Sequence, residues 1–138
     1  MSEGPPPSPP RSRGGGKVEE RALSCVGARF RVHGRDPGTG LDCIGLVAWA
    51  TGRAAPSGYA LRGGSADRIA AGLDAAGLAR VDRARAGDVV VALAGAGQFH
   101  FAIVTTRGFV HADAGLRRVV ERPGVLPWPV IGIWRAGA

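Results

Sequence analysis

The chain has 138 residues, which is enough for one domain with a single hydrophobic core. Its 45% hydrophobic content excludes a wholly disordered protein, and no apolar run approaches the roughly 20 residues that cross a bilayer. The formal charge of +7 comes almost entirely from arginine, and no basic stripe is interleaved with aromatic residues, so nucleic acid is not an expected partner.

The first 16 residues are rich in proline and glycine and offer little apolar surface to bury. This composition predicts a disordered tail at 1–16 and a folded domain at 17–138. The tail also lacks the apolar segment of a signal peptide, so no export signal is predicted. The site of action is therefore left open between the cytoplasm and delivery to the cell wall by another route.

The first half of the chain predicts helices. Apolar residues at helical spacing indicate a helix over 18–26, with Cys25 on its buried side. The segment 27–41 contains several glycines and predicts a loop. Asp42 then precedes an apolar run that ends before Gly52, which is the pattern of an N-capped, buried helix. Ser65 is expected to cap a further helix that runs to about Ala76.

After Gly77 the pattern changes to short runs typical of strands, with turn residues between them. The predicted strands are Leu78–Val81, Asp88–Leu93, His100–Thr105, Phe109–His111, Arg117–Glu121 and Val130–Trp134. Helices followed by an antiparallel meander predict an α+β, two-layer domain.

Cys43 is the candidate nucleophile. The chain has two cysteines, too few for a disulfide framework, and neither has the spacing of a zinc site. As the first residue of the helix capped by Asp42, Cys43 would lie beside free N–H groups and the positive end of the helix dipole, which favour a thiolate. The neighbouring Asp42 carboxylate acts in the opposite direction. A small buried hydrophobic residue is the alternative interpretation of Cys43.

A nucleophilic thiol needs a base, and the base needs an orienting group. His100 lies within a predicted strand, where a buried imidazole needs a partner. His111 closes the next strand and Asp113 follows it, so either could orient His100. In a regular hairpin, His100 and His111 would lie toward opposite ends, and only a bulge or strand curvature would bring them together. His33 is predicted to be a solvated or substrate-side loop residue.

These residues together resemble the NlpC-type cell-wall peptidases, papain-like cysteine hydrolases that cut peptides of bacterial peptidoglycan. The matching segments are Val26–Arg31, Leu41–Val47, Ala86–Val90, the strand around His100, and Phe109–Ala112. The similarity extends over roughly residues 18–135. The ordered set of cysteine motif, Gly-Asp strand and two histidines is far more specific than any one member.

The resemblance implies a papain-like fold, in which the cysteine helix packs on a curved antiparallel sheet. It implies Cys43 as nucleophile, His100 as base and His111 as orienting residue, with no metal or organic cofactor. Asp42, Phe30 and Ile44 take the places of substrate-binding residues. The family often has Tyr where Phe30 stands and Ser where Ile44 stands. The resemblance therefore predicts the type of reaction better than it predicts which bond is cleaved.

Three functional hypotheses follow. The first is a monomeric cysteine endopeptidase acting on peptidoglycan or muropeptides, with delivery by a phage-like particle as one route to the wall. The second is an amidase or acyl-transfer relative of the same fold that acts on a non-wall amide or thioester. The third is a catalytically silent binding module. Tyr59 and the loop 62–64 are further candidates to line the cleft, although ordinary loop residues are the alternative.

Overall fold

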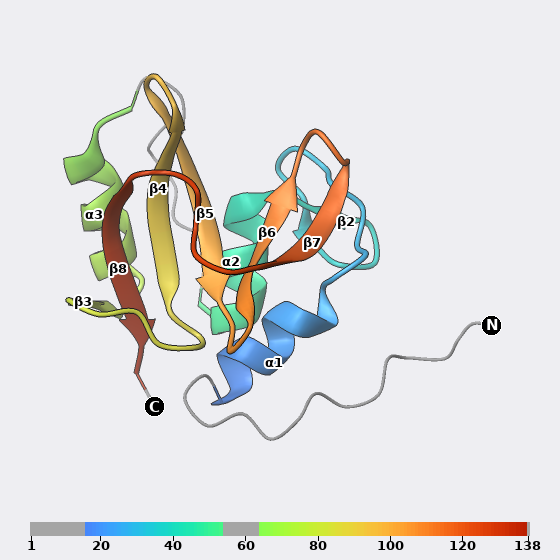
Figure 1. The fold of residues 1–138 in the computed structure, drawn as a ribbon, viewed down its shortest axis with the longest axis horizontal. Helices are drawn as coiled ribbons and strands as arrows, with labels where there is room; N and C mark the ends of the chain where they lie inside the picture. The colour runs from blue at the N-terminus through green and yellow to red at the C-terminus, as the bar shows by residue number, and fades with distance from the viewer. Residues whose placement is uncertain (1–15, 54–63, 138) are drawn as a thin grey trace.

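A six-stranded antiparallel sheet forms one layer of the protein, and three helices that precede it in the chain pack beside it (Figure 1). The computed structural model describes residues 16–53 and 64–137. The helices are α1 (Gly16–Ser24), α2 (Cys43–Thr51) and α3 (Ala66–Ala75). The strands of the sheet are β3 (Leu78–Val81), β4 (Val89–Gly95), β5 (Gln98–Val104), β6 (Gly108–Asp113), β7 (Arg118–Pro123) and β8 (Val130–Ala136). This is the α+β architecture that the sequence predicts.

The predicted elements agree closely with the observed ones. Asp42 caps α2 and Ser65 caps α3, each through a side-chain oxygen that accepts a backbone N–H three residues later. The segment predicted as a loop at 27–41 contains two strands of two residues each, β1 (Arg35–Asp36) and β2 (Gly40–Leu41), which pair with each other. Gly16 begins α1, and the rest of the predicted tail lies outside the described residues, as does Tyr59.

The strand order departs from a simple meander. The order is β3-β8-β4-β5-β6-β7, so β4 to β7 form a meander while the last strand inserts between β3 and β4. The segment between β7 and β8 crosses in front of the sheet to reach this place (Figure 1). In this place β8 pairs with both β3 and β4, the ring of Trp134 is buried, and its Nε1 donates to Asp74 on α3.

The core lies between α2 and the sheet. Helix α2 is apolar on almost every side, which is the pattern of a helix that is largely buried. Its buried residues include Leu46, Val47 and Ala50, and they belong to the same cluster as Phe101 and Ile103 of β5. Because burial of each large apolar side chain contributes about 1.5–3 kcal/mol, this packing fixes the position of α2 on the sheet.

Strands β5 and β6 separate beyond a short stretch of pairing. Their register pairs Ile103 with Val110 and Val104 with Phe109, and the ladder stops there. Strand β6 instead pairs with β7 from Gly108 to Asp113. The two strands therefore diverge, and α2 is visible behind the gap between them (Figure 1). This separation creates the space in which the candidate site lies.

Candidate active site

Cys43 lies at the N-terminus of α2, with a residue exposure of only 5%. The Asp42 side chain caps one of the free N–H groups at this end of the helix, since Gly45 N donates to Asp42 Oδ1 at 2.8 Å, and Leu46 N makes the first regular helix bond, to Asp42 O at 2.9 Å. The N–H groups of Cys43 and Ile44 are directed at the thiol instead. A third N–H, that of Phe101 on β5, reaches it from the sheet.

The charge state of the thiol differs from the sequence-based expectation. Burial raises the pKa of Cys43 to about 12; the Phe101, Cys43 and Ile44 N–H groups lower it, and the Asp42 carboxylate raises it. Desolvation therefore outweighs the helix N-terminus, because a thiolate here would lose its water and face a neighbouring negative charge. Burial and the Asp42 carboxylate thus both favour the neutral thiol of Cys43 over its thiolate.

His100 and His111 are in direct contact. The Nε2 atom of His100 lies 2.8 Å from the Nδ1 atom of His111, and the two rings are nearly perpendicular, at 88°. Counting on from the Ile103–Val110 pair, His111 falls opposite Ala102, one diagonal step from His100 on the same face. The expectation that a regular hairpin would hold the two histidines toward opposite ends was therefore wrong, because the observed register makes them diagonal neighbours.

Asp113 lies on the far side of His111. Its Oδ2 atom is 3.8 Å from His111 Nε2, which is too far for a hydrogen bond. Among the described residues His111 Nε2 has no hydrogen-bond partner, although it is buried. The two residues that the sequence offers as alternative orienting groups are thus arranged in series, His100 to His111 to Asp113.

Trp128 covers the histidine pair. Its ring centroid is 5.2 Å from that of His100 and 5.5 Å from that of His111, with edge-on geometry. The Arg122 guanidinium lies over the Trp128 ring and over Phe109. The sequence indicates Trp128 only as core or cover for the sheet, since a single Trp in the crossing segment gives no sign that it will meet His100.

The surroundings keep both imidazoles neutral. Burial lowers the pKa of His100 to about 4, His111 lowers it as well, and Asp113 opposes them. Burial also lowers the pKa of His111; Asp113 raises it and Arg122 lowers it. At neutral pH the site therefore holds a thiol and two neutral imidazoles, one of which can accept a proton.

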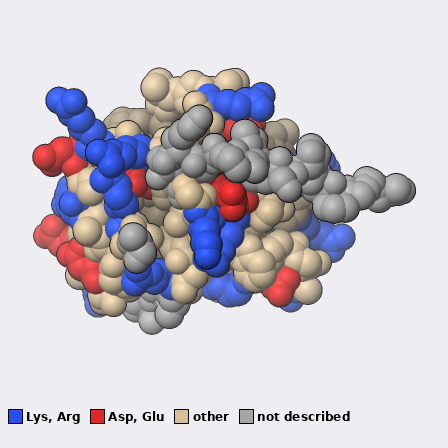
Figure 2. All heavy atoms as spheres, turned by 90° about the horizontal axis from the view of Figure 1, so that it is seen from below, with Lys and Arg blue, Asp and Glu red and all other residues tan. Residues whose placement is uncertain are grey.

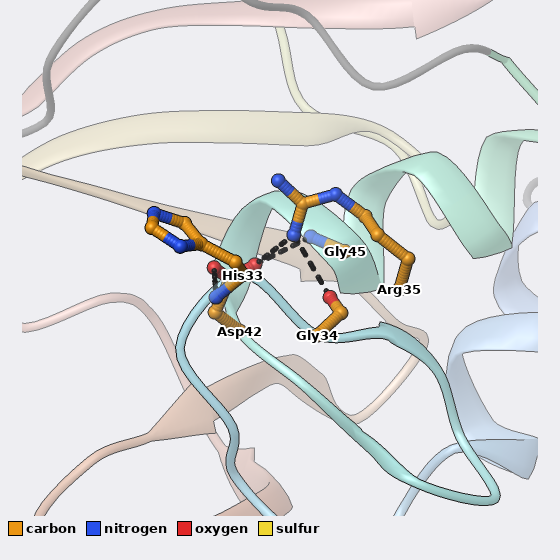
Figure 3. Close-up of polar contacts among 5 residues, drawn as sticks. All are labelled: His33, Gly34, Arg35, Asp42 and Gly45. Atoms are coloured by element: carbon orange, nitrogen blue, oxygen red, sulfur yellow. Dashed lines mark hydrogen bonds and ion pairs between the residues drawn. The ribbon is translucent and has the colours of Figure 1, made fainter.

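The Asp42 carboxylate already accepts hydrogen bonds from other residues of the protein (Figure 3). Besides the Gly45 N–H, it accepts the backbone N–H of His33 at 2.7 Å and Arg35 Nη1 at 2.8 Å. Arg35 Nη1 also donates to the Gly34 carbonyl at 2.8 Å, which fixes the guanidinium in place. The sequence did not single out Arg35, because its meeting with Asp42 depends on the β1–β2 turn.

A cleft of about 650 Å³ joins these groups. All six site residues expected from the sequence line it: Phe30, Asp42, Cys43, Ile44, His100 and His111. His33, Asp113 and Trp128 also line it, which agrees with the expectation of a substrate-side His33.

No group of His, Cys, Asp and Glu residues suited to a metal ion occurs in the described ranges 16–53 and 64–137. Within the same ranges, none of the helices has the length and apolarity of a membrane span.

Comparison with known proteins places the fold. The crystal structure of the NlpC/p60 domain of the peptidoglycan hydrolase SagA matches with a TM-score of 0.54 and 25% sequence identity, over 78% of this chain and 86% of that one. The chain has the NlpC/p60 papain-like fold. No protein-family model matches the sequence, and no curated protein does. The NlpC/p60 likeness therefore rests on three-dimensional structure, with the helices first and the six-stranded sheet after them.

Proposed function

We propose that this NlpC/p60-fold protein is a cysteine peptidase that hydrolyses amide bonds in the stem peptides of bacterial peptidoglycan. The observation that carries the proposal is the cleft shared by Cys43, His100 and His111 on a fold like that of a peptidoglycan hydrolase. Cys43 acts as the nucleophile, His100 as the general base and acid, and His111 as the positioning residue for His100.

The histidine contact supports one arrangement of protons. To accept a proton from Cys43 through Nδ1, His100 must carry its own hydrogen on Nε2, where it donates to His111 Nδ1. His111 then carries its hydrogen on Nε2, on the side of Asp113. In this arrangement His111 would hold His100 in the tautomer that leaves Nδ1 free, which is the role of the third residue in a catalytic triad.

The charge states support attack with general-base assistance. As Cys43 Sγ bonds to the amide carbon, its proton passes to His100 Nδ1 and the carbonyl oxygen becomes an oxyanion. The N–H groups at the start of α2 lie beside this oxygen and stabilise its charge. The C–N bond then breaks, and the His100 imidazolium protonates the leaving amine. Water, deprotonated by His100, hydrolyses the thioester, which restores the Cys43 thiol and releases a carboxylic acid.

The substrate side of the cleft supports a second candidate, an amidase or acyl-transfer enzyme of the same fold. Ile44 offers no side-chain hydrogen bond, and Arg35 already occupies the Asp42 carboxylate. Phe30 likewise brings an aromatic ring without a hydroxyl. These features favour an acyl group without a free amine beside the scissile bond. Wall endopeptidase activity remains our first proposal because it also accounts for the likeness to a peptidoglycan hydrolase domain.

The test is digestion of purified peptidoglycan and of isolated stem peptides, with mass spectrometry of the products. We expect new fragments with the wild-type protein and none with Cys43→Ala. Cys25→Ala is the matched control, because Cys25 is a second buried thiol whose pKa burial raises to about 11. If the fragments persist in Cys43→Ala, the proposed nucleophile is wrong. If only non-wall amides or thioesters are cleaved, the second candidate replaces the first.

A further inference from the structure

A second hollow, of about 660 Å³, lies apart from the catalytic residues and is lined by four arginines. They are Arg29, Arg31, Arg117 and Arg118, and all four are exposed. None of them forms an ion pair with another described residue, and no Asp or Glu is among the described lining residues. The hollow therefore gathers four positive charges, and the nearby Asp36 carboxylate, which accepts the Gly38 N–H at 2.7 Å, forms no ion pair with any of them.

The backbone, rather than chance side-chain positions, brings these arginines together. Arg29 and Arg118 face each other across an isolated antiparallel bridge, and Phe30 N donates to Arg117 O at 3.0 Å. On the other side, Arg31 N donates to Leu41 O at 3.1 Å. Arg117 has a left-handed φ of 62°, a conformation that a non-glycine residue rarely adopts. The fold thus holds four like charges around one hollow, and a bound anion would offset their mutual repulsion.

The hollow shares a wall with the catalytic cleft. Phe30 and Val32 line the cleft, whereas Arg29 and Arg31 line the arginine hollow. This alternation is that of an extended segment, whose successive side chains point to opposite sides. A polymer held in the cleft could therefore reach across this segment and place a charged group among the arginines.

The residues that line the arginine hollow indicate which kind of anion it would bind. Guanidinium groups bind phosphate and carboxylate oxygens in a bidentate manner, and a phosphate group offers more acceptor oxygens to several arginines at once. No aromatic residue is among the described lining residues, so the hollow provides no surface on which a nucleic-acid base could stack. On the face drawn in Figure 2, basic side chains are interspersed with acidic and uncharged ones.

We propose that the arginine hollow is a second binding site, for a phosphate group carried by an anionic polymer without stacked bases. That this polymer is associated with the bacterial wall rests on the proposed function; the phosphate site itself does not. Binding there would hold the polymer beside the cleft and lower the KM for substrates that carry phosphate groups, without a change in the chemical step.

The test measures binding in Cys43→Ala, so that no turnover intervenes. The probes are a short inorganic polyphosphate, polyglutamate and a single-stranded oligonucleotide, titrated by calorimetry at low ionic strength. The hollow variant is Arg29→Gln with Arg118→Gln. The matched control is Arg83→Gln with Arg85→Gln, which removes the same charge from exposed side chains that do not line the hollow.

We expect polyphosphate to bind, and the hollow variant to weaken this binding about tenfold while the control pair weakens it less than about twofold. Absence of polyphosphate binding, or an equal loss in both pairs, would overturn the proposal. Tighter binding of polyglutamate or of the oligonucleotide than of polyphosphate would overturn the assignment to phosphate. Polyphosphate binding that depends on the hollow, in a protein that leaves peptidoglycan intact, would reject the proposed function and keep the phosphate site.

Discussion

His100 Nε2 and His111 Nδ1 lie 2.8 Å apart although the ladder between their strands ends before it reaches either residue. A paired hairpin would hold the strands at a fixed spacing and leave the rings one diagonal step apart. Diagonal neighbours on one face are within reach of ring side chains, so the register of β5 and β6 itself accounts for the histidine contact. Trp128 packs against both rings.

The His111–His100 contact predicts a specific loss of turnover. In His111→Ala the His100 ring loses its acceptor and its preferred tautomer, so we expect kcat to fall about 10²- to 10³-fold with little change in KM. His111→Asn, whose Oδ1 can replace the Nδ1 acceptor, should restore part of the activity. Steady-state kinetics on a stem peptide measures both.

Asp113→Asn is the matched variant for the His111 prediction. Asp113 does not touch His100 in the serial arrangement, and its carboxylate is 3.8 Å from His111. We therefore expect a loss of less than about tenfold. A larger loss in Asp113→Asn than in His111→Ala would show that Asp113, rather than His111, orients the base.

The pKa directions predict how the rate depends on pH. Burial lowers the pKa of His100 to about 4, so the base stays neutral and active down to about that pH, and kcat/KM should fall only in more acidic solution. Burial raises the pKa of Cys43 to about 12, so alkylation of Cys43 should keep rising with pH past the usual thiol range near 8.5. Iodoacetamide rates across pH, with Cys25→Ala protein, measure the second effect.

A preformed thiolate–imidazolium pair is the contrary outcome. It would appear as thiolate absorbance at neutral pH that disappears in Cys43→Ala, with an alkylation rate that is flat from mildly acidic to neutral solution. Either result would show that the N–H groups of Phe101, Cys43 and Ile44 outweigh burial in setting the pKa of Cys43.

Local sequence patterns predicted the position of Cys43 at the start of α2, because this position depends on neighbouring residues. Asp42 and Gly52 bracket an apolar run, and these residues do cap α2 at its two ends. The α+β class and the six strands of the main sheet were likewise predictable from periodicity and turn residues. The place of β8 was not, because it depends on pairing with β3 and β4, which lie far from it in the chain.

Features of the site that depend on long-range contacts could not be predicted from the sequence. Position beside a helix N-terminus predicts a lowered thiol pKa for Cys43, but the extent of burial decides the direction, and burial is a property of the whole fold. The partner of Asp42 could not be predicted either, since Arg35 reaches it only because a two-residue hairpin folds back. The catalytic roles of Cys43, His100 and His111 remain predictions to be tested.

The Arg35–Asp42 ion pair predicts that a free amine in the substrate has little effect on the rate of cleavage. Because the guanidinium compensates the carboxylate, N-acetylation of a stem peptide should change kcat/KM of the wild type by less than about threefold. Arg35→Met exposes the Asp42 charge and should create a preference of roughly tenfold for the free amine. The ratio of kcat/KM for paired free and acetylated peptides is the measurement.

Two controls accompany the Arg35 prediction. Adding Asp42→Asn to Arg35→Met removes the charge while an Asn cap preserves α2, so the new preference should vanish. A wild-type protein that already strongly favours the free amine would contradict our interpretation of the pair.

The close approach of Gly45 to Gly34 predicts that helix α2 cannot accommodate a larger residue at this position without moving. A Cβ atom at Gly45 would overlap the carbonyl oxygen of Gly34, the residue that also accepts a hydrogen bond from Arg35. Helix propensity favours Ala over Gly by about 1 kcal/mol, whereas overpacking against backbone costs about 1–3 kcal/mol and shifts the helix. We therefore expect Gly45→Ala to lower the free energy of unfolding by up to about 2 kcal/mol net and to reduce kcat by displacing Cys43. Gly95→Ala is the control, since its nearest neighbour would be Gln98 Cβ at 4.0 Å. Urea denaturation that ranks Gly45→Ala at or above wild type would mean that the loop 33–35 yields without strain, and the guanidinium of Arg35 would then not be held as rigidly as its contacts with Gly34 and Asp42 imply.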